Sequence, residues 1–388
     1  MKRLTFRLTV LLLSLAGFNL AEAQYTANTP SGAQTVTTAV PFLRISPDAR
    51  AGGMGDLGAA TSPDANSAFY NLAKTPFAKK PIGVGLTYTP WLKDLGLNDV
   101  YLLSAAGYYK LDDQQAISAS LRYFSLGNIQ FTDYSGTTLG EGRPRELGAD
   151  FGYSRKLSNK LSIGIALRYI NSNLAGGYAT TGTTYKAGSA VAGDISLYYT
   201  TAKENGEGFT YGLTLTNLGT KIGYTNDATQ KDYIPANLTL GAAYTKVFDE
   251  DSKIMFGLDL HKLLVPQAPV SVDNGGTTDS TNLVNYRGKG VASSWFSSFS
   301  GPSQLKLINA SIGAEYSYQD QFMARVGYYY EDNSQGGRKY FTVGVGLRYS
   351  VMELNFSYLV PSGNGVTRNP LSNTIRFGLS FDLDNDKK

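Results

Sequence analysis

Apolar and polar side chains alternate along most of this chain. Between residues 82 and 383, successive stretches of about 9 to 13 residues place apolar side chains at every second position. In the clearest stretch, Phe341, Val343 and Val345 alternate with small or polar residues. A period of two places alternate side chains on opposite faces of a β-strand. Each stretch is therefore predicted to form a strand with one apolar and one polar face.

The number of such segments indicates the architecture. They fall near residues 82–90, 99–110, 115–126, 145–156, 161–171, 189–201, 208–218, 234–247, 252–262, 305–318, 321–331, 339–350, 352–361 and 373–383. This repeating pattern is typical of a transmembrane β-barrel, and an even count places both ends of the barrel chain on the same side. We expect an all-β, antiparallel transmembrane barrel of about 14 strands. A soluble β-sandwich or propeller is the alternative.

The connections between these segments alternate in length. Short turns are expected at 111–114, 157–160, 202–207, 249–251, 319–320 and 350–351. Longer loops are expected at 91–98, 127–144, 172–188, 219–233, 262–304, 332–338 and 362–372. Outer-membrane barrels have short periplasmic turns and long external loops. The order is unbroken along the chain, which favours a count of fourteen.

The N-terminal residues predict the compartment. Lys2, Arg3 and Arg7 precede an apolar stretch, and Ala21-Glu22-Ala23 is a small-x-small cleavage site, so residues 1–23 are predicted to be a cleaved signal peptide. Residues 24–80 lack sustained alternation and are predicted to form a plug, or hatch, segment. Residues 81–388 are predicted to form the barrel. The expected location is the outer membrane of a Gram-negative bacterium.

Composition narrows the function classes. Removing residues 1–23 would leave 32 basic and 30 acidic side chains, a net charge of about +2, which gives no support for nucleic-acid binding. The chain has no cysteine, which excludes disulfides and thiolate metal sites. With 27 Tyr, 18 Phe and 43 Gly, the composition suits strands, interfacial girdles and turns. No cofactor and no metal are expected.

Charged residues occur on the polar face of the predicted strands. Five are basic and five acidic: Arg122, Arg168, Arg325, Arg348, Arg376, Asp150, Asp194, Asp259, Glu315 and Glu353. An Arg facing lipid at the midplane would cost about 2–4 kcal/mol, so these side chains should point into the lumen. They could line an ion or substrate path. Because the signs balance, a paired network that braces the barrel is the favoured interpretation.

The loop over residues 262–304 is far longer than the others and carries Trp295, Phe296 and Phe299. Exposed aromatic side chains on loops are common binding surfaces, which makes these three the candidate contacts with cargo or a partner protein. Alternatively, they cap the barrel mouth or sit at the lipid interface. Turn residues at 274–276 and 300–302 predict a projecting hairpin that could pair with a partner strand.

No enzymatic residues are expected. His261 is the only histidine, and it shares a strand face with Asp259. The two positions are about 7 Å apart along a strand, and a single lumen histidine gives little support for a catalytic pair. Gly52-Gly53-Met54-Gly55 is not a nucleotide-binding loop, because no strand leads into it and no Lys-Ser/Thr follows it.

The N-terminal segment carries a family resemblance. Residues 40–60, with Pro47, Asp48, Arg50, Met54 and Gly55, resemble the start of the PorV (LptO) family. This family belongs to the FadL-like outer-membrane barrels and to the type IX secretion system of Bacteroidetes. Further on, Asp64 and the stretch 69–74, which includes Asn71, look like the hatch element of the family, with Leu72 where the family usually has Pro. Tyr88-Thr89-Pro90-Trp91-Leu92 also fits the family pattern.

The resemblance implies a shuttle for secreted proteins. Such a protein receives cargo at the type IX translocon barrel through the C-terminal signal domain of the cargo. It then delivers the cargo to a cell-surface attachment complex with a sortase-like peptidase, where the cargo is anchored to lipopolysaccharide. The alternative is a FadL-like transporter of small hydrophobic molecules, which should have a continuous apolar lumen. The inward face here is mostly Gly, Ser, Thr, Tyr and charge.

Overall fold

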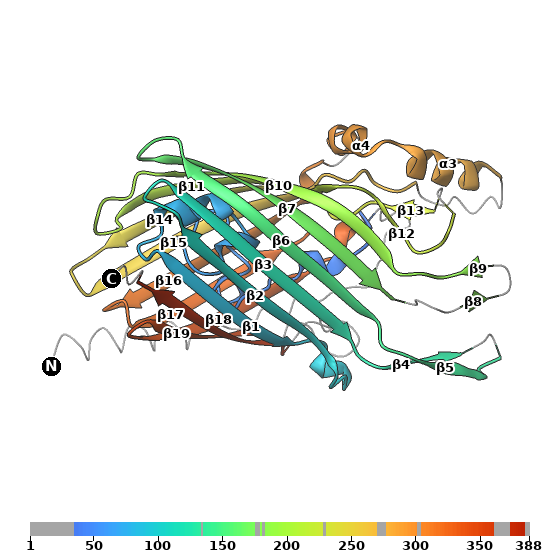
Figure 1. The fold of residues 1–388 in the computed structure, drawn as a ribbon, viewed down its shortest axis with the longest axis horizontal. Helices are drawn as coiled ribbons and strands as arrows, with labels where there is room; N and C mark the ends of the chain where they lie inside the picture. The colour runs from blue at the N-terminus through green and yellow to red at the C-terminus, as the bar shows by residue number, and fades with distance from the viewer. Residues whose placement is uncertain are drawn as a thin grey trace.

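The computed structural model describes residues 35–132, 135–174, 179–180, 183–227, 230–269, 277–300, 304–360 and 373–384. Fourteen strands form one closed antiparallel barrel (Figure 1). They are β1 (Ile82–Pro90), β2 (Val100–Lys110), β3 (Gln115–Leu126), β6 (Arg145–Lys156), β7 (Leu161–Asn173), β10 (Gly188–Thr200), β11 (Gly208–Gly219), β14 (Asn237–Val247), β15 (Ser252–Leu263), β16 (Ile308–Tyr318), β17 (Phe322–Tyr330), β18 (Lys339–Tyr349), β19 (Met352–Val360) and β20 (Ile375–Leu383). The predicted fold class and strand count are confirmed, and every strand end lies within three residues of its predicted position.

Each strand pairs with its neighbour in the sequence, and β1 pairs with β20 to close the barrel, with Ile82 opposite Leu383. The alternation of the sequence decides which side chains point outward. In β18, Phe341, Val343 and Val345 are exposed on the outside, whereas Thr342 is buried toward the lumen. The outer face is thus apolar and the lumen polar, which is the arrangement that a lipid environment stabilises.

The two ends of the barrel differ. Short turns connect the strands at the end that we call the short-turn rim. The opposite long-loop rim carries three small two-stranded sheets and two helices (Figure 1). The sheets pair β4 (Ile129–Thr132) with β5 (Thr138–Gly142), β8 (Ala179–Thr180) with β9 (Thr183–Thr184), and β12 (Ile222–Gly223) with β13 (Lys231–Asp232). The helices are α3 (Thr277–Gly288) and α4 (Val291–Ser297). No helix within the described ranges has the length and apolar character needed to cross a bilayer.

The predicted hairpin in the loop over residues 262–304 is wrong for the part of this loop that the structure describes. Residues 277–297 form α3 and α4 instead of two strands. The stretch has no period-two alternation, and Thr277, Thr278 and Asp279 are residue types that favour helix starts. The predicted turn at Asn274-Gly275-Gly276 and most of the turn at Ser300-Gly301-Pro302 lie outside the described residues.

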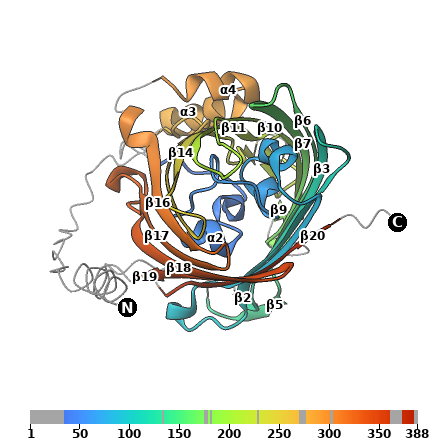
Figure 2. The same cartoon turned by 90° about the vertical axis from the view of Figure 1, so that its left-hand side faces the viewer.

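Residues 35–80, here called the lumenal segment, lie inside the barrel (Figure 2). The segment contains the short helices η1 (Pro41–Arg44), α2 (Ala49–Gly52), η2 (Ser67–Phe69) and η3 (Leu72–Phe77). It begins at the long-loop rim, where the Ala39 amide donates to the Tyr233 carbonyl at 2.9 Å. It ends at the short-turn rim, where Lys110 Nζ donates to the Ala78 carbonyl at 3.2 Å. Its use as a plug stays a prediction, and the predicted signal peptide lies outside the described residues.

Glycine allows the lumenal segment to approach the barrel wall. Gly55 has φ +69°, a left-handed conformation that suits glycine, and its amide donates to Thr342 Oγ1 at 2.8 Å. A Cβ at Gly327 on β17 would overlap the backbone of Met54 and Gly55. The segment therefore lies directly against β17 and β18 at this level.

Candidate functional site

The first motif residue of the lumenal segment is a helix cap. The Asp48 carboxylate accepts a hydrogen bond from the Ala51 amide at 2.9 Å and thereby caps α2. Pro47 and Asp48 are both buried. The cap fixes the direction of α2 and so places the next motif residue, Arg50, over the barrel wall.

Arg50 joins the lumenal segment to the barrel. Its guanidinium donates two hydrogen bonds to the Glu315 carboxylate of β16, at 3.0 and 2.8 Å. It also donates to Asp64 Oδ2 at 2.6 Å and to Ser62 Oγ at 2.8 Å within the lumenal segment. Such two-point contacts between Arg and a carboxylate are strong and directional.

Four of the predicted lumen charges, together with Asp382, extend this contact toward the short-turn rim. Glu315 accepts from Arg325 at 2.6 Å, and Arg325 lies 3.5 Å from Glu353. Glu353 in turn pairs with Arg348, which lies 3.1 Å from Asp382. Positive and negative groups alternate along this ladder, so each charge has a neighbour of opposite sign.

The other six predicted charges lie outside this ladder. Arg168 pairs with Asp150 and with Asp194, the latter at 2.9 Å. Arg376 lies 3.6 Å from Asp56 of the lumenal segment. Arg122 and Asp259 contact backbone groups instead of each other. All ten side chains face the lumen, although Arg348 is partly exposed near the short-turn rim.

Backbone groups of the lumenal segment satisfy two of these charges. Arg122 donates to the Leu43 carbonyl at 3.1 Å and to the Phe69 carbonyl at 3.3 Å. The Asp259 carboxylate accepts from the Gly58 and Ala59 amides, both at 2.8 Å. These contacts attach the segment to β3 and β15. The arrangement supports the bracing interpretation over an open ion path.

Asn71 is a second cap. Its side-chain oxygen accepts from the Ala73 amide at 3.0 Å and begins η3, while its Nδ2 donates to the Ala59 and Leu197 carbonyls, both at 2.9 Å. Leu72, where the family resemblance implies a proline, is the first residue of this short helix. Met54 is fully buried and packs with Leu57 in the interior.

Sequence reasoning missed several buried residues. Lys74 Nζ is buried and donates to the Gly58 carbonyl at 2.9 Å and to Thr61 Oγ1 at 3.0 Å. Arg44, Glu331 and Arg338 form a cluster near the long-loop rim. Lys74, Arg44, Glu331 and Arg338 lie outside the predicted strands or at their ends. There the alternation does not predict which way a side chain points. The one feature of the sequence that could have indicated Lys74 as a lumenal residue is its place in the hatch-like stretch 69–74.

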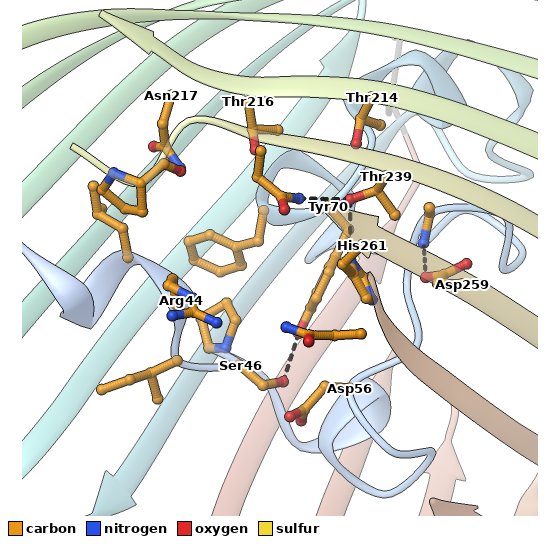
Figure 3. Close-up of a pocket in the computed structure, with 18 of the residues that line it drawn as sticks. Arg44, Ser46, Asp56, Tyr70, Thr214, Thr216, Asn217, Thr239, Asp259 and His261 are labelled. Atoms are coloured by element: carbon orange, nitrogen blue, oxygen red, sulfur yellow. Dashed lines mark hydrogen bonds between the residues drawn. The ribbon is translucent and has the colours of Figure 1, made fainter. Parts of the chain in front are cut away.

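A cavity of about 140 Å³ lies in the half of the lumen nearer the long-loop rim. Its wall is mixed. Hydroxyl and amide side chains, among them Ser46, Thr214, Thr216, Asn217 and Thr239, share it with apolar side chains such as Leu43, Phe69 and Leu263 (Figure 3). The Ser46 and Tyr70 hydroxyls are 2.8 Å apart. The wall also includes charged groups, from Arg44 to Asp56 and Asp259 (Figure 3). The cavity therefore combines polar and apolar surface.

His261 lines this cavity but is not paired with Asp259. Its Nδ1 lies 3.1 Å from Thr239 Oγ1, and its Nε2 lies 3.3 Å from Ser311 Oγ. Asp259 is instead held by the two backbone amides described above. Ser311 is fully buried, so it is not placed as a nucleophile for a bound substrate. A carboxylate that orients the histidine, as in a catalytic triad, is missing from its described hydrogen bonds.

The cluster at the rim centres on Glu331. Arg338 donates to both carboxylate oxygens, at 2.8 and 2.7 Å, and Arg44 Nη2 donates to Oε1 at 3.3 Å. Burial raises the pKa of Glu331, but the hydrogen bonds and charge of Arg338 and the charge of Arg44 outweigh this effect. The net pKa of Glu331 is therefore below its ordinary value of 4.5.

The predicted loop aromatics lie on a platform formed by α3 and α4. Phe296 and Phe299 are 78% and 51% exposed, and Trp295 is half-buried. Lys262 Nζ lies 5.1 Å from the centre of the Phe299 ring. The structure thus brings the three aromatics together on the long-loop rim, away from the lumen charges.

The platform is anchored to the neighbouring loop. The Tyr233 hydroxyl donates to the carbonyls of Tyr286 and Lys289 at 3.0 and 2.9 Å, and Lys221 Nζ donates to the Lys289 carbonyl at 2.7 Å. These groups satisfy carbonyls at the C-terminal end of α3, where a cation is also favourable. The anchoring attaches the end of α3, which leads directly into α4 and its aromatics, to the loop between β11 and β14.

Comparison with solved structures concerns the fold. The CymD monoaromatic hydrocarbon channel has a TM-score of 0.50 and 13% identity, with 87% of this chain and 98% of that chain covered. The toluene transporter TodX of P. putida has a TM-score of 0.49 and 12% identity, covering 87% and 99%. A FadL homologue of Pseudomonas aeruginosa has a TM-score of 0.45 and 12% identity, covering 90% and 99%. At such identities the similarity to CymD shows the fold alone.

Comparison with protein families is more specific. A search of the curated proteins finds no match. The family model described as "Type IX secretion system protein PorV" matches residues 28–270, which is more than half of the chain. This match includes the lumenal segment with its Asp48, Arg50 and Asn71 contacts, together with nine of the barrel strands in whole. The chain therefore belongs to the PorV family of type IX secretion system proteins, and it is an outer-membrane β-barrel protein.

Proposed function

We propose that this protein is a shuttle of the type IX secretion system in a Bacteroidetes-like bacterium. It binds the C-terminal signal domain of secreted cargo at the translocon barrel and delivers the cargo to a sortase-like attachment complex that transfers it to lipopolysaccharide. The family membership supports the secretion role. The observation that carries the binding step is the anchored platform with its exposed Phe296 and Phe299.

The platform has properties of a protein-binding surface. Large aromatic side chains that are exposed on a rigid support dominate many interfaces, because they bury much apolar area at little entropic cost. Phe296 and Phe299 lie on the long-loop rim, which faces the outside in this class of barrel. Cargo that has left the translocon would meet this rim first.

The lumen gives less support to the alternative function, transport of small hydrophobic molecules. Binding pockets for small molecules are mostly apolar and have volumes of about 300–1,000 Å³. The cavity here has about 140 Å³, and charged, hydroxyl and amide side chains interrupt its apolar wall. A site that binds a hydrophobic ligand would need a larger and more apolar space.

The test is a mild-detergent affinity purification of the tagged protein from outer membranes, followed by mass spectrometry. Wild type should recover cargo with C-terminal signal domains, together with the translocon barrel or the sortase-like peptidase. Recovery of the barrel with bound fatty acid and no cargo would favour the transporter instead.

A double variant tests the platform itself. Phe296→Ser with Phe299→Ser should lower cargo recovery at least about tenfold, because loss of an interface hot spot costs about 2 kcal/mol or more. Phe248→Ser is the matched control, since Phe248 is 62% exposed on a turn at the short-turn rim. If cargo recovery persists in the double variant, the shuttle uses another surface.

A further inference from the structure

Tyr233 lies where the lumenal segment meets the platform. It belongs to the loop between β11 and β14, and only 3% of its surface is exposed. On one side, its carbonyl accepts a hydrogen bond from the Ala39 amide of the lumenal segment at 2.9 Å. On the other side, its hydroxyl donates to carbonyls of the platform. Tyr233 thus joins the start of the lumenal segment to the platform.

The ring of Tyr233 forms part of an apolar base under α3. Val36 of the lumenal segment, Tyr233 and Val265 form one buried cluster, and Tyr286 of α3 packs against it. The Tyr233 and Tyr286 rings meet edge to face, with their centroids 5.4 Å apart. Aromatic pairs prefer this geometry over a parallel sandwich, so the contact has a direction as well as an apolar area. The ring therefore helps to set where α3 lies on the rim.

The hydroxyl of Tyr233 acts on the joint between the two helices. α3 ends at Gly288, and α4 begins after Gly290. A Cβ added to either glycine would meet nothing within 4 Å, and glycine itself leaves the backbone wide conformational freedom. The hydroxyl donates to the Tyr286 and Lys289 carbonyls, which lie on the two sides of Gly288. This contact restrains a joint that its own sequence leaves free.

Lys221 supports Tyr233 in this role. Its Nζ lies 4.3 Å from the centre of the Tyr233 ring, where a cation is attracted to the aromatic face. The same Nζ donates to the carbonyls of Arg287 and Lys289, the latter at 2.7 Å. The last carbonyls of a helix lack partners within the helix. Tyr233 and Lys221 supply these partners from a neighbouring loop.

The joint decides the direction of the exposed aromatics. Trp295 and Phe296 belong to α4, and Phe299 follows it closely, so all three come after the joint. Ser294 of α4 is fully buried and also interacts with the Tyr233 hydroxyl. A binding surface that is already held in one orientation loses less conformational entropy when its partner binds.

We propose that Tyr233 is the positioning residue of the platform. It holds the joint between α3 and α4 against the start of the lumenal segment and so presents Phe296 and Phe299 to the cargo. This inference rests on the proposed function, because it assigns the residue that orients the cargo-binding surface. Tyr233 itself is buried and acts through the platform.

The test compares the platform and cargo binding in Tyr233→Phe, which removes the hydroxyl and keeps the ring. A Trp91→Phe background leaves Trp295 as the only tryptophan. In the full-length barrel without cargo, Trp295 emission should move to longer wavelength and be quenched more strongly by acrylamide, because the half-buried indole becomes more exposed. Affinity for a dye-labelled C-terminal signal domain, taken from a cargo recovered in the affinity purification, should fall about fivefold.

Tyr224→Phe is the matched control. Tyr224 lies in the same loop and donates to Ser172 Oγ at 2.9 Å, and none of its described hydrogen bonds reaches the platform. This variant should change neither Trp295 fluorescence nor signal-domain affinity. Heat-dependent gel mobility verifies that each barrel is folded.

Unchanged Trp295 fluorescence in Tyr233→Phe would overturn the positioning role, even if the affinity falls. Altered fluorescence with unchanged affinity would overturn the link to cargo binding, and equal effects of Tyr224→Phe would show general loosening instead. If the wild type binds no signal domain, the shuttle function is wrong, and Trp295 fluorescence alone then decides whether Tyr233 positions the platform.

Discussion

Arg50 is the residue on which the lumenal segment depends most. Its side chain is 11% exposed and is shared by Glu315 and Asp64. Arg50→Gln would leave two partly buried carboxylates with fewer counter-ions. Removing one partner of a buried pair costs about 3–5 kcal/mol and of an exposed pair less than about 1 kcal/mol, so we expect a loss of about 2–3 kcal/mol in urea unfolding of the barrel in lipid vesicles. Lys203→Gln, which breaks an exposed pair with Glu207, should cost less than about 1 kcal/mol.

Glu331 makes the stability of the cluster at the long-loop rim depend on pH. Its pKa is lowered in the folded protein, because Arg338 and Arg44 outweigh the effect of burial. A lowered carboxyl pKa contributes stability that is present above the unfolded pKa and is lost as pH falls through the folded pKa. The midpoint temperature for thermal unfolding of the barrel should therefore be constant at neutral pH and fall only well below pH 4.5. A fall between pH 6 and 8 would contradict this assignment.

For a single strand residue, the sequence predicts whether its side chain points into the lumen. It does not predict which groups that side chain binds. The parity of the strands indicates that Arg122 and Asp259 face inward. It contains no information on the lumenal segment, whose carbonyls and amides are their actual partners. The same limit explains Lys74 and Arg44, which lie in a segment without periodicity. Their environment is created by the packing of residues distant in the sequence.

The contact between β17 and the lumenal segment depends on the close approach of their two backbones at Gly327. Gly327→Ala would place a Cβ in the backbone of Met54 and Gly55, where nothing can give way without moving the segment. We expect the segment to shift, and a protease added to the purified protein to cleave it faster. Gly193→Ala on β10 is the control, because its Cβ would meet only the Ala166 carbonyl oxygen at 3.6 Å. Equal cleavage of both variants would argue against the close contact.

Strands and loops differ in how far the sequence predicts them. The strands can be predicted from local sequence alone. Lipid on one side and a polar lumen on the other require apolar and polar side chains to alternate along each strand. The platform helices obey no such rule. Their apolar residues, such as Leu283 and Val284, remain partly exposed, and α3 is held by Tyr233 and Lys221 from another loop. A helix stabilised by tertiary contacts leaves only a weak pattern in its own sequence.

The whole molecule is a barrel whose buried polar contacts lie in its lumen. Lipid covers the apolar outside, so the inside must be stabilised by hydrogen bonds and ion pairs instead of apolar packing alone. The lumenal segment provides many of these partners, from Arg50 near β16 to Asn71 near β10. Strand pairing closes the wall, and the segment fills much of the space that a barrel of this size would leave for water.

This arrangement predicts the conductance of the protein. A barrel of fourteen strands without internal contents would hold an aqueous channel. Because the lumenal segment crosses the lumen from rim to rim, we expect the purified protein in planar bilayers to show no steady open pore. A variant that lacks residues 36–77 should insert as a folded barrel and give stepwise conductance. Large steady openings of the wild type, or a folded deletion variant that stays closed, would show that the segment does not close the lumen.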